Sequence, residues 1–335
     1  MAIIFVVAGH CLSLFNWDGI LSGGVLYSLM PNSTVFFVFI AGFLFQHLSG
    51  KFEYRDYIKK KSLNVLLPYL VLSLPVIIIR SLTHDGVFDP INLSHWPTFA
   101  RTASWALLTG GHTMLQLWFI PMIALFYLVA PALLWVDRDG RFYRLLPVLL
   151  AVTTLVHRPS NTDHILQSCA YFLPVYIYGM WFSRHHERAM YWHGRWLAAL
   201  LTLVTALTWL EVTFLKRAGF IASAAMFSTE HGTVDTNAVQ KLLLCGVLLV
   251  ILRRFGNVLR PQLSYLAEVS FGIFFLHGFF IKILHLYLVS SRQVAPTGSF
   301  LLYGLAVTVT LALSTGCVWL ARNLLGRYSR YVIGC

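Results

Sequence analysis

The chain has 335 residues, of which 58% are hydrophobic and 11% are charged, and its mean hydropathy is +0.70. Soluble domains carry about 25% charged residues, so this composition argues against a soluble domain and indicates a polytopic membrane protein. The net charge of +12 could suggest a nucleic-acid partner, but the positions of the basic residues argue for no nucleic acid. No break in composition divides the chain, so we expect one membrane domain over residues 1–335.

Long apolar runs predict the helices, because a membrane-spanning helix needs about 20 such residues. Clear runs lie between Asp18 and Lys51, Lys61 and Arg80, Thr113 and Asp137, Asp163 and Arg184, Tyr265 and Ser290, and Arg292 and Arg322. Shorter candidates cover residues 2–16, 145–157, 196–210 and about 236–252. Together these runs predict an all-α protein with about ten transmembrane helices.

The basic residues support this count. If the N-terminus is cytoplasmic, 17 of the 25 Lys and Arg residues fall in cytoplasmic segments. The outer loops keep only Arg101, Arg158, Lys216, Arg217 and Arg292. This bias is the positive-inside pattern. We therefore expect both termini to be cytoplasmic, in an integral protein of a bacterial inner membrane. The positive charge then reflects topology, with a further attraction to anionic lipid or to a phosphate-bearing ligand.

The cysteines and the polar loops are the places where a metal or a substrate could bind. The five cysteines are scattered without paired spacing, so we expect neither a disulfide framework nor a metal site. The two longest outer loops, about 83–112 and 211–235, are places where a substrate site could be built. Their histidine and acidic residues are His84, Asp85, Asp89, His95, His112, Glu211, Glu230, His231 and Asp235.

Three ionisable residues stand out inside apolar runs, where such groups are costly and usually face the bundle interior or a wet cavity. His10 lies in the first run, and Glu268 and His277 lie in the run near the C-terminus. Burial disfavours the imidazolium, so we expect His10 to be neutral and able to accept a proton from a hydroxyl. The alternative is a histidine that simply bonds to a neighbouring helix.

Other residues carry weaker signals. Ser270 and His277 are seven positions apart and share a helix face, with Gly272 nearby to allow close packing; polar contacts between helices are the alternative. Lys60 and Lys61 are suited to binding phosphates, although topology alone also explains them. Trp118 could form a sugar-stacking surface or belong to the aromatic belt.

Several segments together resemble the acyltransferase-3 family of integral membrane acyltransferases. They are Val6–His10, Phe36–Phe45, Tyr57–Lys61 with Leu66–Tyr69, Leu117–Pro121 and Ser270–His277. The segments occur in the family order and cover the chain from end to end. Each is weak alone, but the ordered set is specific.

The resemblance implies a ten-span fold and acyl transfer from cytoplasmic acyl-CoA to a carbohydrate hydroxyl. It implies His10 as the catalytic residue. We expect an O-acetyltransferase with no bound cofactor, acetyl-CoA as the donor and a cell-surface or lipid-linked glycan as the acceptor. Lys60 and Lys61 are assigned to coenzyme A, and Trp118, Ser270 and His277 to the substrate path.

The chain departs from the family pattern in two places. The family usually has an arginine eleven positions before the histidine, a position that falls before Met1 here, so we expect the sequence to lack its true beginning. Arginines that commonly precede the Leu-Pro-Tyr segment are replaced by Asn64 and Val65, which suggests a divergent subfamily.

Two other classes of protein remain as alternatives at this point. One is a transporter or exporter of a glycan, lipid or solute, with His10, Glu268 and His277 forming a proton or substrate pathway. No inverted repeat or matched pair of broken helices, as expected in such transporters, is visible in the sequence. The other is a structural subunit of a polysaccharide synthesis complex. Of the three, only an enzyme consumes acyl-CoA without a gradient.

Overall fold

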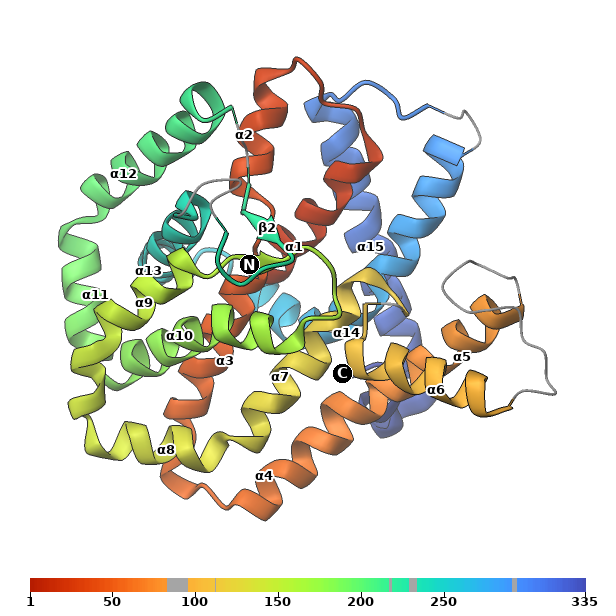
Figure 1. Ribbon diagram of the computed structural model, residues 1–335, viewed down its shortest axis with the longest axis horizontal. Helices are drawn as coiled ribbons and strands as arrows, with labels where there is room; N and C mark the ends of the chain where they lie inside the picture. The colour runs from red at the N-terminus through yellow and green to blue at the C-terminus, as the bar shows by residue number, and fades with distance from the viewer. Residues whose placement is uncertain (83–95, 112, 217–218, 229–233, 291–293) are drawn as a thin grey trace.

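A computed structural model describes the chain apart from residues 83–95, 112, 217–218, 229–233 and 291–293 (Figure 1). The protein is 81% helical, which confirms the all-α class. The described strands are two short ones, β1 (Arg158–Pro159) and β2 (Ala222–Ser223), which pair in parallel.

Most of the α-helices follow the apolar runs of the sequence, whereas α4 and α11 are polar. The first nine are α1 (Ala2–Cys11), α2 (Leu21–Leu29), α3 (Thr34–His47), α4 (Tyr54–Lys61), α5 (Leu67–Leu82), α6 (Trp96–Thr109), α7 (Phe119–Leu128), α8 (Ala130–Asp139) and α9 (Leu146–Leu155). The others are α10 (Ile165–Arg184), α11 (His186–Arg195), α12 (Leu197–Trp209), α13 (Thr236–Phe255), α14 (Arg260–His285), α15 (Phe300–Leu325) and α16 (Ser329–Val332). Short 3-10 or π segments adjoin them: η1 (Leu12–Leu14), η2 (Ser49–Lys51), η3 (Ser62–Leu66), η5 (Leu115–Trp118), η6 (Arg141–Leu145), η7 (Leu210–Phe214), η8 (Leu286–Ser290) and η9 (Gly326–Tyr328).

Several helical segments are long and apolar enough to cross a bilayer. Among the described residues there are five: Leu21–His47, Tyr54–Arg80, Leu197–Phe214, Arg260–Val289 and Phe300–Val332. A sixth is formed if the two segments Leu115–Leu128 and Ala130–Asp139, which meet at an angle of 58°, make one bent span. The chain is therefore an integral membrane protein, and the count of ten spans stays a prediction.

The surface of these helices is itself apolar. On α15, for example, Leu301 is 82% exposed, Leu305 is 58% exposed and Trp319 is 59% exposed. Soluble monomers rarely expose large contiguous apolar patches. Side chains of this kind on a long helix are expected to contact lipid.

Two glycines allow helices α3 and α10 to pack closely at the centre of the bundle. A Cβ atom on Gly42 of α3 would collide with the Tyr176 carbonyl of α10, and one on Gly179 of α10 would collide with the Phe39 carbonyl of α3. Small residues let helix backbones approach closely in membrane bundles. These two helices therefore form a tight central pair (Figure 1).

A turn between α2 and α3 breaks the first long apolar segment. It contains Pro31 and Asn32, and Asn32 has a left-handed backbone with φ 61°. Asparagine tolerates this conformation better than most residues. The short helix α1 packs against the same turn, since a Cβ on Gly9 would come within 3.1 Å of the Met30 carbonyl oxygen.

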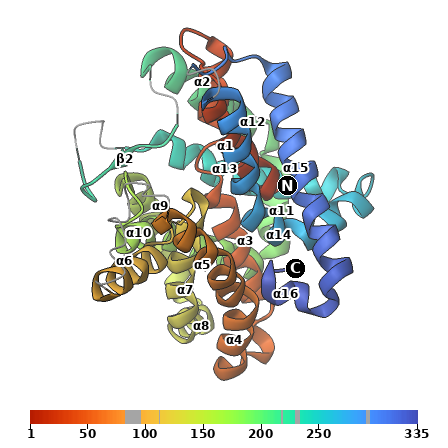
Figure 2. The same cartoon turned by 90° about the vertical axis from the view of Figure 1, so that its right-hand side faces the viewer.

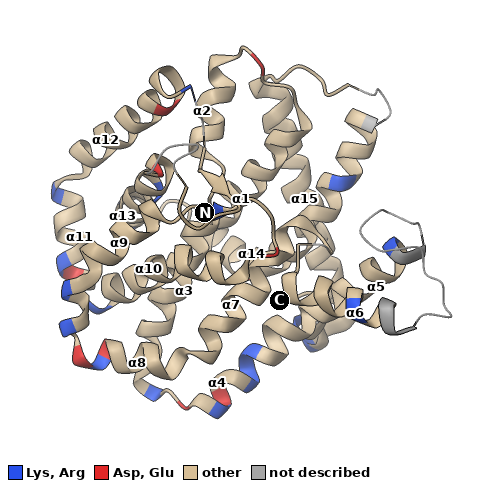
Figure 3. Ribbon diagram, viewed as in Figure 1, with Lys and Arg blue, Asp and Glu red and all other residues tan. Residues whose placement is uncertain are grey.

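Basic residues gather at one end of the molecule. Figure 3 shows Lys and Arg along the rim formed by α4, α8 and α11. Figure 1 and Figure 2 both place α4 and α8 at one end of the bundle and α2 at the other. Lys and Arg of these three helices thus lie along one edge of the fold, and the orientation of the termini stays a prediction.

Candidate active site

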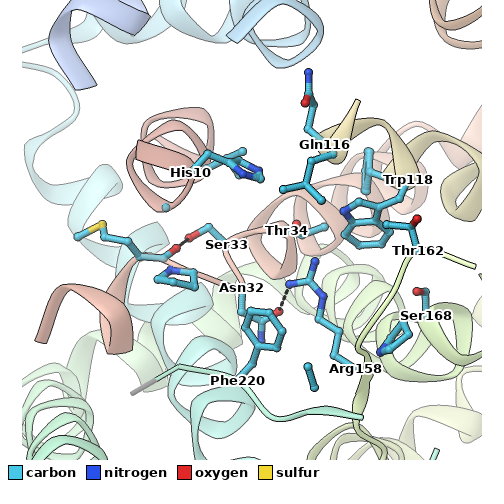
Figure 4. Close-up of a pocket in the computed structure, with 18 of the residues that line it drawn as sticks. His10, Asn32, Ser33, Thr34, Gln116, Trp118, Arg158, Thr162, Ser168 and Phe220 are labelled. Atoms are coloured by element: carbon cyan, nitrogen blue, oxygen red, sulfur yellow. Dashed lines mark hydrogen bonds between the residues drawn. The ribbon is translucent and has the colours of Figure 1, made fainter. Parts of the chain in front are cut away.

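A cavity of about 360 Å³ lies where α1, the α2–α3 turn, η5 and the β1–β2 pair meet (Figure 4). Its walls carry His10, Trp118 and Arg158, with neutral polar side chains between them. Those neutral residues are Ser13, Asn32, Ser33, Thr34, Gln116, Ser160, Asn161, Thr162 and Ser168. A concave apolar site with a few converging polar groups is the usual form of a ligand site.

His10 enters the cavity from α1. Its neighbour Gly9 brings the helix against the α2–α3 turn, so the imidazole faces the polar residues of that turn (Figure 4). Neither ring nitrogen forms a hydrogen bond with any other described residue. An imidazole with both nitrogens unpaired beside a cavity can exchange a proton with a bound hydroxyl.

His277 of α14 lies directly behind His10. The two ring centroids are 5.4 Å apart, with an interplanar angle of 46°. His277 is fully buried, and its Nδ1 donates to the Ile273 carbonyl over 3.0 Å. A carbonyl can only accept, so Nδ1 carries the proton and Nε2 is an acceptor. That buried Nε2 has no hydrogen-bond partner among the described residues.

Arg158 enters from the opposite wall, on β1. Its guanidinium carbon is 4.8 Å from the centre of the Trp118 ring and 4.4 Å from that of Phe220, so aromatic rings cover it. Stacking on aromatic faces stabilises a guanidinium cation. Burial lowers the pKa of Arg158 to about 10, with Tyr171 and Asp235 acting in the opposite direction. The group is therefore still a cation at neutral pH.

The loop that carries Arg158 is fixed by backbone contacts. β1 pairs with β2, with Arg158 opposite Ala222. The side-chain amide of Gln167 donates to the carbonyls of His157 at 2.9 Å and Ser223 at 3.1 Å. These bonds join two loops that are far apart in the sequence and hold Arg158 at the cavity.

A chain of buried hydrogen bonds supports Arg158 from behind. Its Nη1 donates to Asn32 Oδ1 over 3.4 Å, and Asn32 Nδ2 donates to the Tyr171 hydroxyl over 2.6 Å. The Tyr171 hydroxyl donates to Asp235 Oδ2 over 3.5 Å. Asp235 also accepts from the Ala238 amide, so it caps α13. The left-handed turn at Asn32 thus connects the cavity to a carboxylate.

The sequence-predicted residues lie at different distances from the cavity. His10 and Trp118 line it, and Trp118 stacks on Phe172 with 5.7 Å between ring centroids. His277 does not line the cavity but contacts His10. Ser270 lies on the same helix as His277, outside the lining, and donates to the Ala267 carbonyl over 2.7 Å.

The lysines and Glu268 are elsewhere. Lys60 is exposed, and the Lys61 ammonium lies 4.9 Å from the centre of the Tyr127 ring. Both belong to α4 and are absent from the cavity lining. Glu268 forms an ion pair with Arg322 of α15 over 2.9 Å. Glu268 therefore does not extend a line of polar groups from His10 and His277.

The two outer loops singled out in the sequence contribute less than expected. Residues 96–109 form α6, and residues 211–214 continue α12 as η7. Glu211 and Lys241 belong to a buried polar group, here termed the Lys241 cluster: Ser28, Thr208, Glu211, Thr236, Asn237, Gln240 and Lys241. His84, Asp85, Asp89, His95, His112, Glu230 and His231 lie outside the described residues.

Sequence reasoning did not identify Arg158, Asn32 or Phe220 as site residues. One signal was present, because Arg158 is among the few basic residues that break the positive-inside pattern. A basic residue that topology does not explain is a candidate for binding. The stacking rings come from separate loops, and no local pattern connects them.

The fold and the site define a membrane protein in which a histidine with no hydrogen-bond partner among the described side chains faces a cavity. A family model described as an acyltransferase domain matches residues 1–319. The chain belongs to the acyltransferase-3 family and is a membrane acyltransferase. No match was found among curated proteins or among solved structures.

Proposed function

We propose that the protein is an acyl-CoA-dependent O-acyltransferase that transfers an acetyl group to a hydroxyl of a cell-surface or lipid-linked carbohydrate. The observation that carries this proposal is the position of His10. In a chain of this acyltransferase family, His10 faces a cavity, and neither of its ring nitrogens is paired with a residue that the structure describes. An imidazole in that state can act as the general base for a hydroxyl nucleophile.

His277 has a supporting role in this proposal. Its Nδ1 is committed to the Ile273 carbonyl, so only Nε2 can face a proton donor. When His10 takes a proton from the acceptor, the unpaired His277 Nε2 beside it can accept a hydrogen bond from the imidazolium. This arrangement favours the charged form of His10 at the moment the hydroxyl is deprotonated.

The donor is assigned to the basic end of the molecule. Lys60 and Lys61 would bind the coenzyme A phosphates there as point charges. The first residue of α3, Thr34, lines the cavity, and the α4 lysines follow the other end of α3. A helix of 14 residues is about 21 Å long. The acyl arm of the donor would therefore have to cover this length to reach His10.

The direction of α3, from the cavity to the basic rim, also indicates which end of the protein faces the cytoplasm. We place the rim of α4, α8 and α11 in the cytoplasm, with ten spans and both termini inside, because Lys and Arg gather on that rim. The cavity lies at the opposite end of α3, among the loops that carry β1 and β2. The acceptor carbohydrate would then approach from outside. Reporter fusions at the C-terminus and in the β1 loop test this orientation.

The direct test uses the full chain in lipid with radiolabelled acetyl-CoA and a panel of glycans and lipid-linked sugars. We expect label to enter a carbohydrate with wild type and not with His10→Ala. His164→Ala is the matched control, since His164 is an exposed histidine at the start of α10. Equal transfer by His10→Ala would contradict the assignment. Lys60→Ala and Lys61→Ala should raise the KM for acetyl-CoA and leave kcat unchanged.

A further inference from the structure

Two ionisable side chains line the cavity, and they differ in kind. Among the described residues of the lining, only His10 and Arg158 can carry a charge. Figure 4 shows them on opposite walls, with the intervening polar groups all neutral. A base and a permanent cation therefore face the same space of about 360 Å³.

The surroundings of Arg158 restrict how it can bind a ligand. The rings of Trp118 and Phe220 lie over the guanidinium at 4.8 and 4.4 Å, and its N–H groups point outward in its own plane. One of them donates to Asn32. The other N–H groups are the donors that a ligand in the cavity can reach.

Arg158 also lacks a direct counter-charge. It forms no ion pair with a carboxylate among the described residues. Asp235 instead acts on it through Tyr171 and Asn32. Even a partly buried cation without a paired anion is destabilising, so its position at the cavity is not explained by stability alone. A ligand oxygen with negative charge would complete the arrangement.

We propose that Arg158 is a catalytic residue that binds the acyl carbonyl oxygen while it becomes an oxyanion; this rests on the proposed acyl transfer. The acceptor hydroxyl attacks the thioester carbon, its proton passes to His10, and the carbonyl electron pair moves to the oxygen held by Arg158. The carbonyl then re-forms, the C–S bond breaks, and the coenzyme A thiolate takes the proton from His10. Donors aimed at a developing oxyanion stabilise the transition state more than the ground state.

Kinetics of Arg158 variants test this proposal, with acetyl-CoA as donor and dodecyl glucoside as the acceptor probe. Removing one oxyanion donor typically lowers kcat by about 100-fold to 1,000-fold. We expect a loss of this size in Arg158→Gln with little change in either KM. Arg158→Lys keeps a cation and should recover part of the rate. Arg144→Gln, an exposed arginine on the basic side, is the control and should behave as wild type.

Two kinetic outcomes overturn the proposal. Wild-type kcat in Arg158→Gln, with His10→Ala inactive, rejects the role of Arg158 and leaves the proposed function intact. A raised KM with normal kcat shows instead that Arg158 anchors an anionic part of a substrate in the ground state. No turnover by wild type with any donor or acceptor is failure of the proposed function itself.

A binding measurement tests the same residue without turnover. Methanesulfonate and acetate carry the same charge. The oxygens of methanesulfonate surround a tetrahedral sulfur, as the oxyanion of the acyl-transfer intermediate is bonded to a tetrahedral carbon. We expect methanesulfonate to raise the Tm of the protein in lipid more than acetate does. Arg158→Gln should abolish this difference, and His10→Ala should keep it. Equal stabilisation by both anions, or no effect of the Arg158 substitution, contradicts an oxyanion site.

The hydrogen-bond chain behind Arg158 gives a positioning test. Tyr171→Phe removes the hydroxyl that joins Asn32 to Asp235, so it should lower kcat by less than Arg158→Gln and leave KM unchanged. Tyr178→Phe on the same helix removes a hydroxyl that contacts His193, away from the cavity lining, and serves as its control. Equal rates in the two variants would show that the chain does not position Arg158.

Discussion

Two buried polar groups adjoin each other in this protein and differ in how their atoms are paired. The Lys241 cluster sits at the C-terminal end of α2, and the cavity begins at the turn that follows. Lys241 Nζ donates to the carbonyls of Ser28 and Leu29, both over 2.8 Å, and to Gln240 Oε1 over 2.9 Å. Glu211 accepts from Ser28 at 2.7 Å and from Thr236 at 2.9 Å.

The cavity shows the opposite pattern. Within the part of the chain that the structure describes, the His10 side chain has no hydrogen-bond partner, His277 Nε2 is unpaired, and Arg158 has no ion-paired carboxylate. In the Lys241 cluster the Asn237 Oδ1 atom alone is buried without a partner. Saturated polar groups stabilise a fold, whereas unpaired ones around a cavity are available to a ligand. From this contrast we infer that the Lys241 cluster stabilises the fold and that the polar residues at the cavity take part in the reaction.

The largest effect is expected on stability, from a substitution in the Lys241 cluster. Lys241→Met removes the ammonium that donates to the Leu29 carbonyl and to Gln240 Oε1, and it removes a buried cation that interacts electrostatically with Glu211. Breaking a buried charge network in this way costs about 3–5 kcal/mol. We expect a large fall in the Tm of the protein in lipid, measured by tryptophan fluorescence. Lys59→Met, an exposed lysine of α4, is the control. A Tm equal to that of the control would contradict a stabilising role of the Lys241 cluster.

His277→Ala tests whether the residues at the cavity contribute to turnover more than to stability. General-base catalysis contributes about 100-fold to 10,000-fold, and His277 supports only part of it. We expect kcat to fall by about tenfold to 100-fold with little change in Tm. His193→Ala is a suitable control, because His193 also bonds a carbonyl in its own helix but lies away from the cavity. Unchanged kcat in His277→Ala would place this histidine with the structural residues.

Trp118 tests the stacking on Arg158. Cation–π contacts contribute about 0.5–2 kcal/mol, so Trp118→Leu should lower kcat by about tenfold. Trp118→Phe keeps a ring and should lose less. If both variants lose activity equally, the ring does not act through the guanidinium, and shape alone explains its place in the lining.

The smallest effect is expected at Ser270. It lies outside the cavity and bonds only its own helix, so Ser270→Ala should change kcat by no more than about twofold and stability by about 0.5 kcal/mol or less. Ser28→Ala is the informative comparison, because it removes a hydroxyl from the Lys241 cluster and should cost about 1–3 kcal/mol. A large loss of activity in Ser270→Ala would show that the substrate path extends along α14.

Helix periodicity and apolar runs predicted much of this molecule. They identified the all-α class, and they marked His10 and His277 as ionisable groups facing the bundle interior. The prediction for Ser270 shows the limit of such reasoning. Seven positions on a helix share a face, but they are also about 10 Å apart along the axis. A shared face therefore did not place Ser270 beside His10, where His277 lies.

The rest of the site depends on contacts between distant loops. Arg158 reaches the cavity because β1 pairs with β2, and Asn32 reaches it because the chain turns with a left-handed residue. Neither feature follows from apolar periodicity, which is what located the helices. The Lys241 cluster was equally hidden, since Glu211 was read as part of an outer loop and is fully buried.

The most direct test measures turnover and unfolding together in His10→Ala and Lys241→Met, each in lipid beside wild type. Our account predicts a crossed result: His10→Ala loses acyl transfer and keeps its Tm, whereas Lys241→Met loses stability and retains turnover per folded molecule. The account is contradicted if His10→Ala keeps turnover, or if it unfolds as readily as Lys241→Met.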